Sequence, residues 1–182
     1  MPLRAVRVNS IYQAQARFFT SPRYPHVHVH KQGSKQAAVS YLSSQPTETS
    51  RAVVGYAPLN KDGTDVDLSR PSRFRINPSF IEALNEVCLK HAHDDPICQA
   101  MAATQDSGHL HIADEKNPPP YGRIPYPEDI IGTIRIEHGK LVRGSFVPMR
   151  EAYRPVSGEG IVKLSEYLEG RMLSLLKSEV DK

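Results

Sequence analysis

Two His-x-His patterns are the part of this sequence best suited to chemistry. The chain has 182 residues and eight histidines, and five of these lie in the segments 26–30 (HVHVH) and 109–111 (HLH). Alternate residues of a β-strand project from one face about 7 Å apart, and neutral imidazoles on one face can bind a divalent metal ion such as zinc. The sequence therefore predicts five metal ligands, which are His26, His28, His30, His109 and His111.

Each pattern also resembles the motif of a known family. The segment 26–30 resembles the motif of histidine-triad nucleotide hydrolases, in which one histidine attacks a phosphate, although Lys31 and Gln32 stand where that family has apolar residues. The segment 109–115 resembles half of the first cupin metal motif, although a helical pattern precedes it where cupins have strands. The alternative for both patterns is a partly exposed strand whose histidines have no shared role.

A second type of site needs only one imidazole. His111 is followed by Asp114, and a histidine close to a carboxylate can act as a general base near neutral pH. We expect the chain to return Arg123 and Asp129 to the end of the His111 strand, where the arginine could hold an anionic substrate group. The predicted catalytic residues are His111, Asp114, Arg123 and Asp129. Alternatively, Arg123 and Asp129 form an ion pair that only fixes the loop.

A proline-rich stretch must position this candidate site. Five prolines lie within the ten residues 118–127, and such a run fits neither a helix nor a central strand. We expect a stiff, extended connection across the surface. The loop 116–129 also provides the alternative function, a non-catalytic binding or protein-interaction module.

The remaining pattern predicts an α+β domain covering residues 1–182. Alternating or apolar runs predict strands at 3–8, 26–30, 52–57, 108–113, 130–137 and 140–147, the last two joined by a His138-Gly139 turn. Helices are predicted over 35–44, after Asn77, after Asp95 and over the C-terminal stripe that runs from Ile161 to Leu175. The expected architecture is an antiparallel sheet of about four or five strands with helices packed on one face.

Composition excludes several classes of protein. Charged residues make up 24% and hydrophobic residues 39% of the chain, which fits a globular protein rather than a fibrous or disordered one. No stretch reaches the roughly 20 apolar residues of a membrane helix, so no membrane partner is expected. Two cysteines, Cys88 and Cys98, cannot form a disulfide framework, and the common hydrolase and nucleotide-binding motifs are absent from the sequence.

The N-terminal segment 1–47 is basic and contains no acid. It carries six of the Lys and Arg residues, although the whole chain has a net charge of only +3. Such a segment is typical of a mitochondrial transit peptide or of a weak phosphate-binding arm. The alternative is a solvated strand and loop that has no special role. The missing nucleic-acid-binding motifs argue against a nucleic-acid partner. For the cellular compartment we expect the cytoplasm, with mitochondrial targeting as the alternative.

Beyond residue 41 the chain resembles a family of small fungal proteins that have no assigned activity. The resemblance begins with the segments 41–46 (YLSSQP) and 54–57 (VGYA). Its strongest stretch comprises 110–112 (LHI), Asp114, 117–120 (NPPP), 122–125 (GRIP), 127–130 (PEDI), Gly132, 147–149 (VPM) and 153–154 (YR). The resemblance implies a fungal, intracellular setting and assigns no site residues. It also favours His111 over His109, because the family keeps a similar residue at the former position and usually differs at the latter.

The function predicted from the sequence is a small-molecule enzyme that depends on His111 and nearby acids, with or without a divalent metal ion. The alternative is an interaction module that uses the loop 116–129. The sequence fixes neither the small-molecule ligand nor the oligomeric state.

Overall fold

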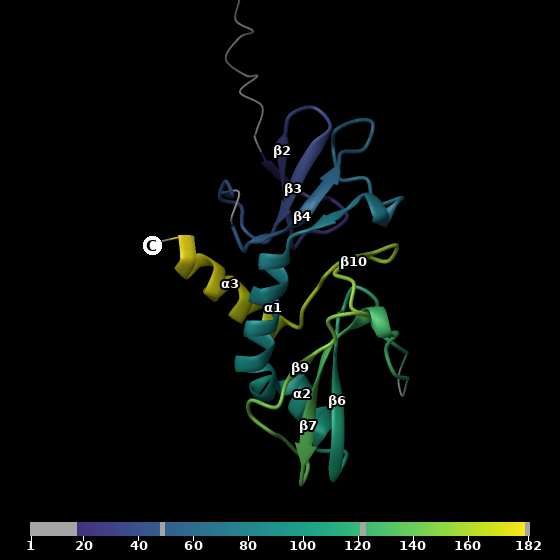
Figure 1. Ribbon diagram of the computed structural model, residues 1–182, viewed down its shortest axis with the longest axis vertical. Coiled ribbons are helices and arrows are strands. Elements are labelled where there is room, and N and C mark those ends of the chain that lie inside the picture. Colours follow the sequence, from purple (N-terminus) through teal and green to yellow (C-terminus); the bar gives the residue numbers. More distant parts are fainter. Residues whose placement is uncertain (1–17, 48–49, 121–122, 181–182) are drawn as a thin grey trace, which may run out of the picture.

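The computed structural model describes residues 18–47, 50–120 and 123–180, and the predicted strand at 3–8 lies outside them. The chain folds into two main antiparallel sheets (Figure 1). The five-stranded sheet has the order β1-β2-β3-β4-β5, with the bounds Phe18–Thr20, His28–Gln32, Gln36–Ser40, Val53–Pro58 and Arg75–Ile76.

The second sheet is built around one long pair of strands. It contains β6 (Ser107–Ala113), β7 (Ile130–Glu137), β8 (Lys140–Leu141) and β9 (Val147–Pro148), and both β8 and β9 pair with β7. A two-stranded ribbon follows, formed by β10 (Val156–Ser157) and β11 (Gly160–Ile161). The predicted α+β class with a five-stranded antiparallel sheet is confirmed, and the second sheet is an addition to it.

Each of the two main sheets contacts at least one helix. The α-helices are α1 (Pro78–His91), α2 (Pro96–Ala102) and α3 (Glu166–Val180), and the short 3-10 helices are η1 (Pro71–Arg73), η2 (Ala92–Asp94) and η3 (Pro127–Asp129). Helix α1 contacts β4 and α3, whereas α2 contacts β6 and β8. Figure 1 shows α1 extending from the first sheet toward the second. None of the helices among the described residues is long and apolar enough to cross a membrane.

The predicted helix over 35–44 is wrong, because this segment forms β3 in the middle of the first sheet. Ala37, Ala38 and Val39 are all fully buried. A central strand that is covered on both faces has a continuous apolar run instead of an alternating one. Such a short run cannot be distinguished from part of a buried helix by periodicity.

Local signals fix the start of α1 and the turn between β7 and β8. Asn77 caps α1, because its Oδ1 accepts a hydrogen bond of 3.1 Å from the backbone N–H of Ser79. The β7–β8 turn has positive φ angles at both His138 (51°) and Gly139 (70°), as a two-residue hairpin requires. One continuous cluster of buried side chains joins the two sheets, and it includes Val29, Val39, Phe80, Leu110, Ile112 and Ile134.

Candidate functional site

The most unusual polar group in the protein is a buried cluster of charges below the proline-rich stretch. The Lys116 ammonium lies 2.8 Å from Oδ2 of Asp114 and 2.7 Å from Oδ1 of Asp129. The side chains of these three residues are at most 2% exposed. We call Asp114, Lys116 and Asp129 the ion cluster. A buried charge is tolerated only when it is paired and hydrogen-bonded, so these three side chains depend on one another.

Further hydrogen bonds use the oxygens of both carboxylates. Oδ1 of Asp114 accepts from the backbone N–H groups of Lys116 and Lys163, at 3.0 and 2.9 Å, and the Tyr153 hydroxyl donates to Oδ2 over 2.8 Å. The Asn117 amide donates to Oδ2 of Asp129 over 2.9 Å. Each oxygen of the two carboxylates therefore lies against a hydrogen-bond donor of the protein or against the Lys116 ammonium. Neither carboxylate is placed to meet a substrate.

Tyr153 is the uncharged member of this network. Burial, and next the nearby Asp114 carboxylate, raises the pKa of Tyr153 well above its ordinary value. The phenol therefore keeps its proton and donates it in the hydrogen bond to Asp114. The Lys116 ammonium also lies 5.4 Å from the centroid of the Tyr153 ring, a distance at which a cation is attracted by an aromatic face.

The chain path explains why these side chains meet. Asp114 follows the last residue of β6, and Asp129 ends η3, immediately before β7 begins at Ile130. The backbone N–H of Asp114 donates to the carbonyl of Asp129 over 2.8 Å. The two carboxylates therefore stand at the two ends of the proline segment, which we define as residues 118–127. The ion cluster closes this loop at its base.

The four predicted catalytic residues do not form one site. Asp114 and Asp129 come together, as expected, but around Lys116. Arg123 is exposed, and neither its side chain nor that of His111 makes an ion pair among the described residues. His111 is half-buried on β6, and its Nδ1 is buried without a hydrogen-bond partner. The alternative Arg123–Asp129 ion pair is also not formed, because Lys116 holds that carboxylate.

The first histidine cluster is divided among three separate partners. Strand β2 begins only at His28, and His26 lies in the preceding turn, where its Nε2 donates to the carbonyl of Val162 over 2.9 Å. Nδ1 of His28 lies 3.2 Å from Oγ1 of Thr20, and Nε2 of the buried His30 donates to the carbonyl of Leu42 over 3.0 Å. Within 18–47, 50–120 and 123–180, no three or more His, Cys, Asp or Glu side chains are arranged to hold a metal ion.

The cysteines are not available as nucleophiles. Cys88 and Cys98 are both buried and unpaired. Burial raises the pKa of the Cys98 thiol to about 12 and that of the Cys88 thiol further still. A thiol must lose its proton to react, so both side chains act as small apolar groups of the core.

Three clefts open on the surface of the described part of the chain. The largest, of about 630 Å³, runs between the start of α2 and the exposed side of α3. A second, of about 300 Å³, lies beside Arg51, and a third, of about 160 Å³, lies below Met149 and Arg154. None of the three is lined by His111, Asp114 or Asp129, although Tyr153, which donates to Asp114, lines the third. The charged groups of the ion cluster therefore line none of these three clefts.

Sequence reasoning missed Lys116, Asn117 and Tyr153. The sequence contained a signal for Lys116. When the backbone turns after Asp114, a lysine two residues later can reach the Asp114 carboxylate. Tyr153 is 39 residues from Asp114, and no local pattern connects the two.

Comparison with known proteins identifies no relative. No protein-family model matches the chain, and neither a curated protein nor a solved structure matches it significantly. The likeness to a fungal family therefore stays a prediction.

Proposed function

We propose that this protein is a non-catalytic interaction module and that its proline segment binds in the groove of a partner protein. The observation that carries the proposal is the exposure of two large side chains on this segment. Ile124 is 74% exposed and Tyr126 is 68% exposed. Exposed tyrosine and isoleucine side chains supply much of the apolar contact in a binding interface.

The backbone of the segment supports this proposal. Tyr126 has φ −62° and ψ 148°, close to the polyproline II values of about −75° and +145°. Proline disfavours the helical region for the residue before it, which fits the extended Tyr126 before Pro127. The Arg123 N–H donates to the Pro120 carbonyl over 3.0 Å, so a turn separates this part of the segment from the run 118–120. Proline-rich ligands bind aromatic-lined grooves well because they lose little conformational entropy when they bind.

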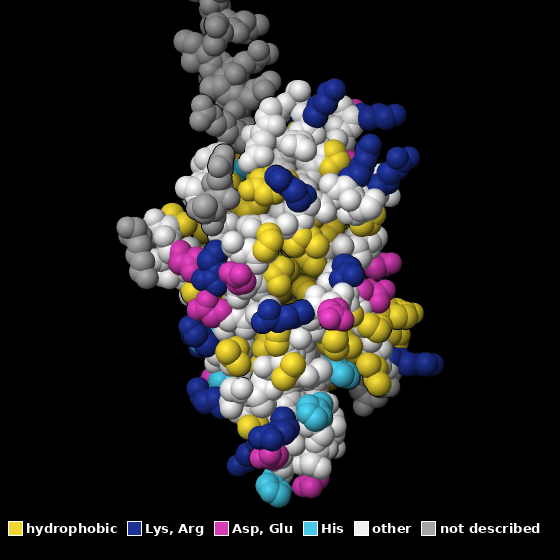
Figure 2. Space-filling model, viewed as in Figure 1, with side chains coloured by type: hydrophobic (Ala, Val, Ile, Leu, Met, Phe, Trp, Pro, Cys, Tyr) yellow, Lys and Arg dark blue, Asp and Glu magenta, His cyan; other side chains and the backbone are white. Residues whose placement is uncertain are grey.

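Both ends of the segment are attached to the domain. On one side Lys116 joins the ion cluster, and on the other the backbone N–H of Asp129 donates to the Tyr126 carbonyl over 2.8 Å. The Arg154 N–H donates to the carbonyl of Glu128 over 2.9 Å. In Figure 2 hydrophobic side chains gather at the right-hand margin, where this loop projects. The loop is therefore presented outward from a fixed base.

The charges around the two apolar side chains suggest the form of the groove. Arg123 is exposed directly before Ile124, and Glu128 is exposed after Pro127. A groove lined by aromatic side chains, with an acidic group at the end that receives Arg123, would complement this segment. The proposed partner class is a domain that recognises polyproline II, such as an SH3 or WW domain.

The same geometry does not favour the enzyme hypothesis. A general base must reach the proton that it removes, within hydrogen-bonding distance of a substrate. Asp114 is completely buried and Asp129 is 2% exposed, and donors from the protein already occupy their oxygens. Neither of the two predicted aspartates is therefore free to act with His111.

Binding to purified SH3 and WW domains tests the proposal. We expect at least one domain of such a panel to bind the full-length protein, measured by biolayer interferometry. We expect Tyr126→Ala and Ile124→Ala each to weaken that binding by at least about tenfold, the effect of losing a central anchor residue. Because both side chains are exposed, neither variant should change the thermal midpoint by more than a degree or two.

A matched control distinguishes binding through the proline segment from non-specific hydrophobic binding. Ile97 on α2 is 56% exposed, so Ile97→Ala removes an equivalent side chain from another surface. This variant should bind as the wild-type protein does. Equal binding by all three variants, or no binding by any domain of the panel, would show that the segment is not a ligand of this class.

A further inference from the structure

The outer edge of β6 has no neighbour among the described residues. In the second sheet β6 pairs only with β7, and it stands at the margin of the sheet in Figure 1. The strand runs for seven residues, Ser107–Ala113, which contain neither a charged residue nor a proline. Natural sheet edges are usually protected by such residues or are kept short, so this long, uncharged edge is suited to pairing.

The hydrogen bonds of β7 show which residues of β6 face outward. The Val142 N–H donates to the Arg135 carbonyl over 2.9 Å, so the backbone of Arg135 faces β8. Arg135 is the register partner of His109. In an antiparallel pair such residues do not bond to each other, and the N–H and C=O groups of His109 therefore point away from β7. Those of His111, two residues along, point the same way.

The side chains of these two residues lie together on the open face of the sheet. Leu110 and Ile112 are buried on the opposite face, and His109 is exposed while His111 is half-buried. Neither imidazole makes a hydrogen bond to another described residue. The nearby Arg135 is paired with Glu137 over 3.1 Å, so its charge is offset.

We propose that β6 pairs antiparallel with β6 of a second copy of this chain, and that His109 and His111 of both copies then bind one divalent transition-metal ion, with zinc as the best fit. The pairing that uses all seven residues is centred on Leu110. It places His109 opposite His111 of the second copy, and His111 opposite His109 of that copy.

Strand geometry supports this arrangement. Residues directly opposite each other have Cβ atoms about 5 Å apart, and alternate residues of one strand are about 7 Å apart. Four imidazoles then rise from the open face around one point, and four nitrogen ligands at about 2.0–2.1 Å are what a zinc site requires. The same register pairs outward-facing residues with outward-facing residues, so each histidine pair also contributes two backbone hydrogen bonds.

The second copy is the occupant that completes the site. One chain supplies only two imidazoles here, and the described residues contain no group of three or more ligands. Two identical edges without charged residues meet without repulsion. Helix α2 contacts both β6 and β8, so it lies below the sheet, on the face opposite to the histidines.

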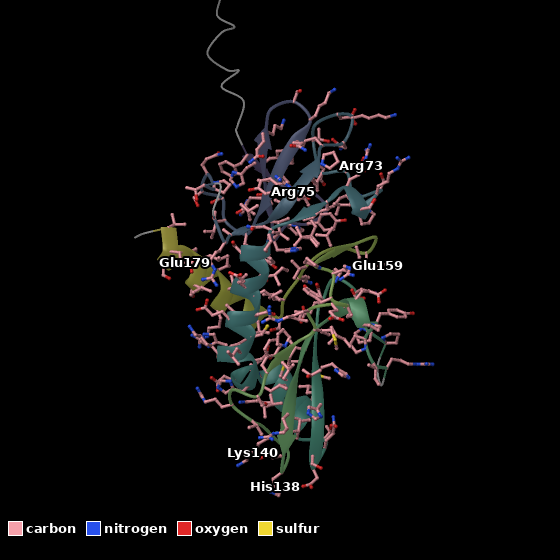
Figure 3. The ribbon with its side chains drawn as sticks, in the orientation of Figure 1. Arg73, Arg75, His138, Lys140, Glu159 and Glu179 are labelled. Carbon is pink, nitrogen blue, oxygen red and sulfur yellow. The ribbon has the colours of Figure 1, made fainter. Side chains whose placement is uncertain are left out.

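Zinc-dependent assembly tests this proposal. The full-length protein, purified without a histidine tag, should be a monomer in EDTA and a dimer with zinc chloride, measured by analytical ultracentrifugation. The dimer should contain 0.5 zinc per chain by elemental analysis. His109→Gln and His111→Gln should each abolish the zinc-dependent dimer, or weaken zinc binding at least tenfold. His138→Gln is the matched control, because this histidine lies at the tip of the β7–β8 hairpin (Figure 3) and is 93% exposed.

A cross-linking measurement tests the register independently of the histidines. Ser107 of one copy should lie opposite Ala113 of the other, whereas two copies of Ser107 should be about 20 Å apart. With zinc, a short bismaleimide should therefore join Ser107→Cys to Ala113→Cys and should join neither variant to itself. The natural cysteines are buried. The proposal fails if zinc leaves the protein monomeric, if the dimer forms equally well in EDTA, or if each variant cross-links mainly to itself.

Discussion

Replacing Lys116 by methionine is expected to lower the free energy of unfolding by about 3–5 kcal/mol, the usual effect of removing one partner from a buried ion pair. The ammonium is 1% exposed and lies within 2.8 Å of two carboxylates. Methionine has a similar length but no charge, so Asp114 and Asp129 would face each other without a cation. Urea denaturation, followed by circular dichroism, measures the change.

Lys90 provides the matched control. This lysine also forms an ion pair, at 2.7 Å from Glu86, but its side chain is 60% exposed. Exposed pairs contribute only about 0–1 kcal/mol, so Lys90→Met should change stability by no more than that. If Lys116→Met were as mild as Lys90→Met, the ion cluster could not be the base that fixes the proline segment.

Gly55→Ala is the second substitution with a large expected effect, a loss of about 3 kcal/mol, the upper part of the usual range for overpacking. Gly55 lies in β4 between β3 and β5. A Cβ atom at this position would overlap the ring of Phe74 and the carbonyl oxygen of Arg75. Because the carbonyl belongs to the backbone of β5, a rotamer change cannot relieve the overlap. Thermal and urea unfolding both report the loss.

Gly170→Ala should have the opposite sign. Gly170 lies within α3, and no heavy atom is within 4 Å of a Cβ added there. Alanine has the higher helix propensity by about 0.8–1.0 kcal/mol, so this variant should be more stable than the wild-type protein.

A stable Gly55→Ala protein would contradict the close contact between β4 and β5.

The sequence predicted best those elements whose signals are local. Asn77 and Pro78 predicted the start of α1, and His138-Gly139 predicted the β7–β8 turn, because caps and tight turns depend on a few adjacent residues. The segment 35–44 was predicted wrongly as a helix, since the apolar run of β3 is defined by strands on either side of it. Local periodicity contains no information about those neighbours.

In the candidate site, too, local features were predicted from the sequence and tertiary contacts were not. The pattern correctly indicated that Asp114 and Asp129 meet at the ends of the proline-rich stretch. It did not show that Lys116 would lie between them or that Tyr153 would donate to Asp114, because these contacts depend on tertiary packing. Alternation along β6 correctly placed His109 and His111 on one face. His26 does not share a face with His28 and His30, because β2 begins at His28 and not at His26.

The most direct test of the proposed function is to map where a partner domain binds. The ¹⁵N-labelled full-length protein would be titrated with the SH3 or WW domain that binds it most tightly, and amide chemical shifts would be recorded. We expect the largest changes at Arg123, Ile124 and Tyr126, with little change in α2 and α3. Largest changes at the cleft between those two helices, or an unchanged spectrum with every domain of the panel, would contradict the role given to the proline segment.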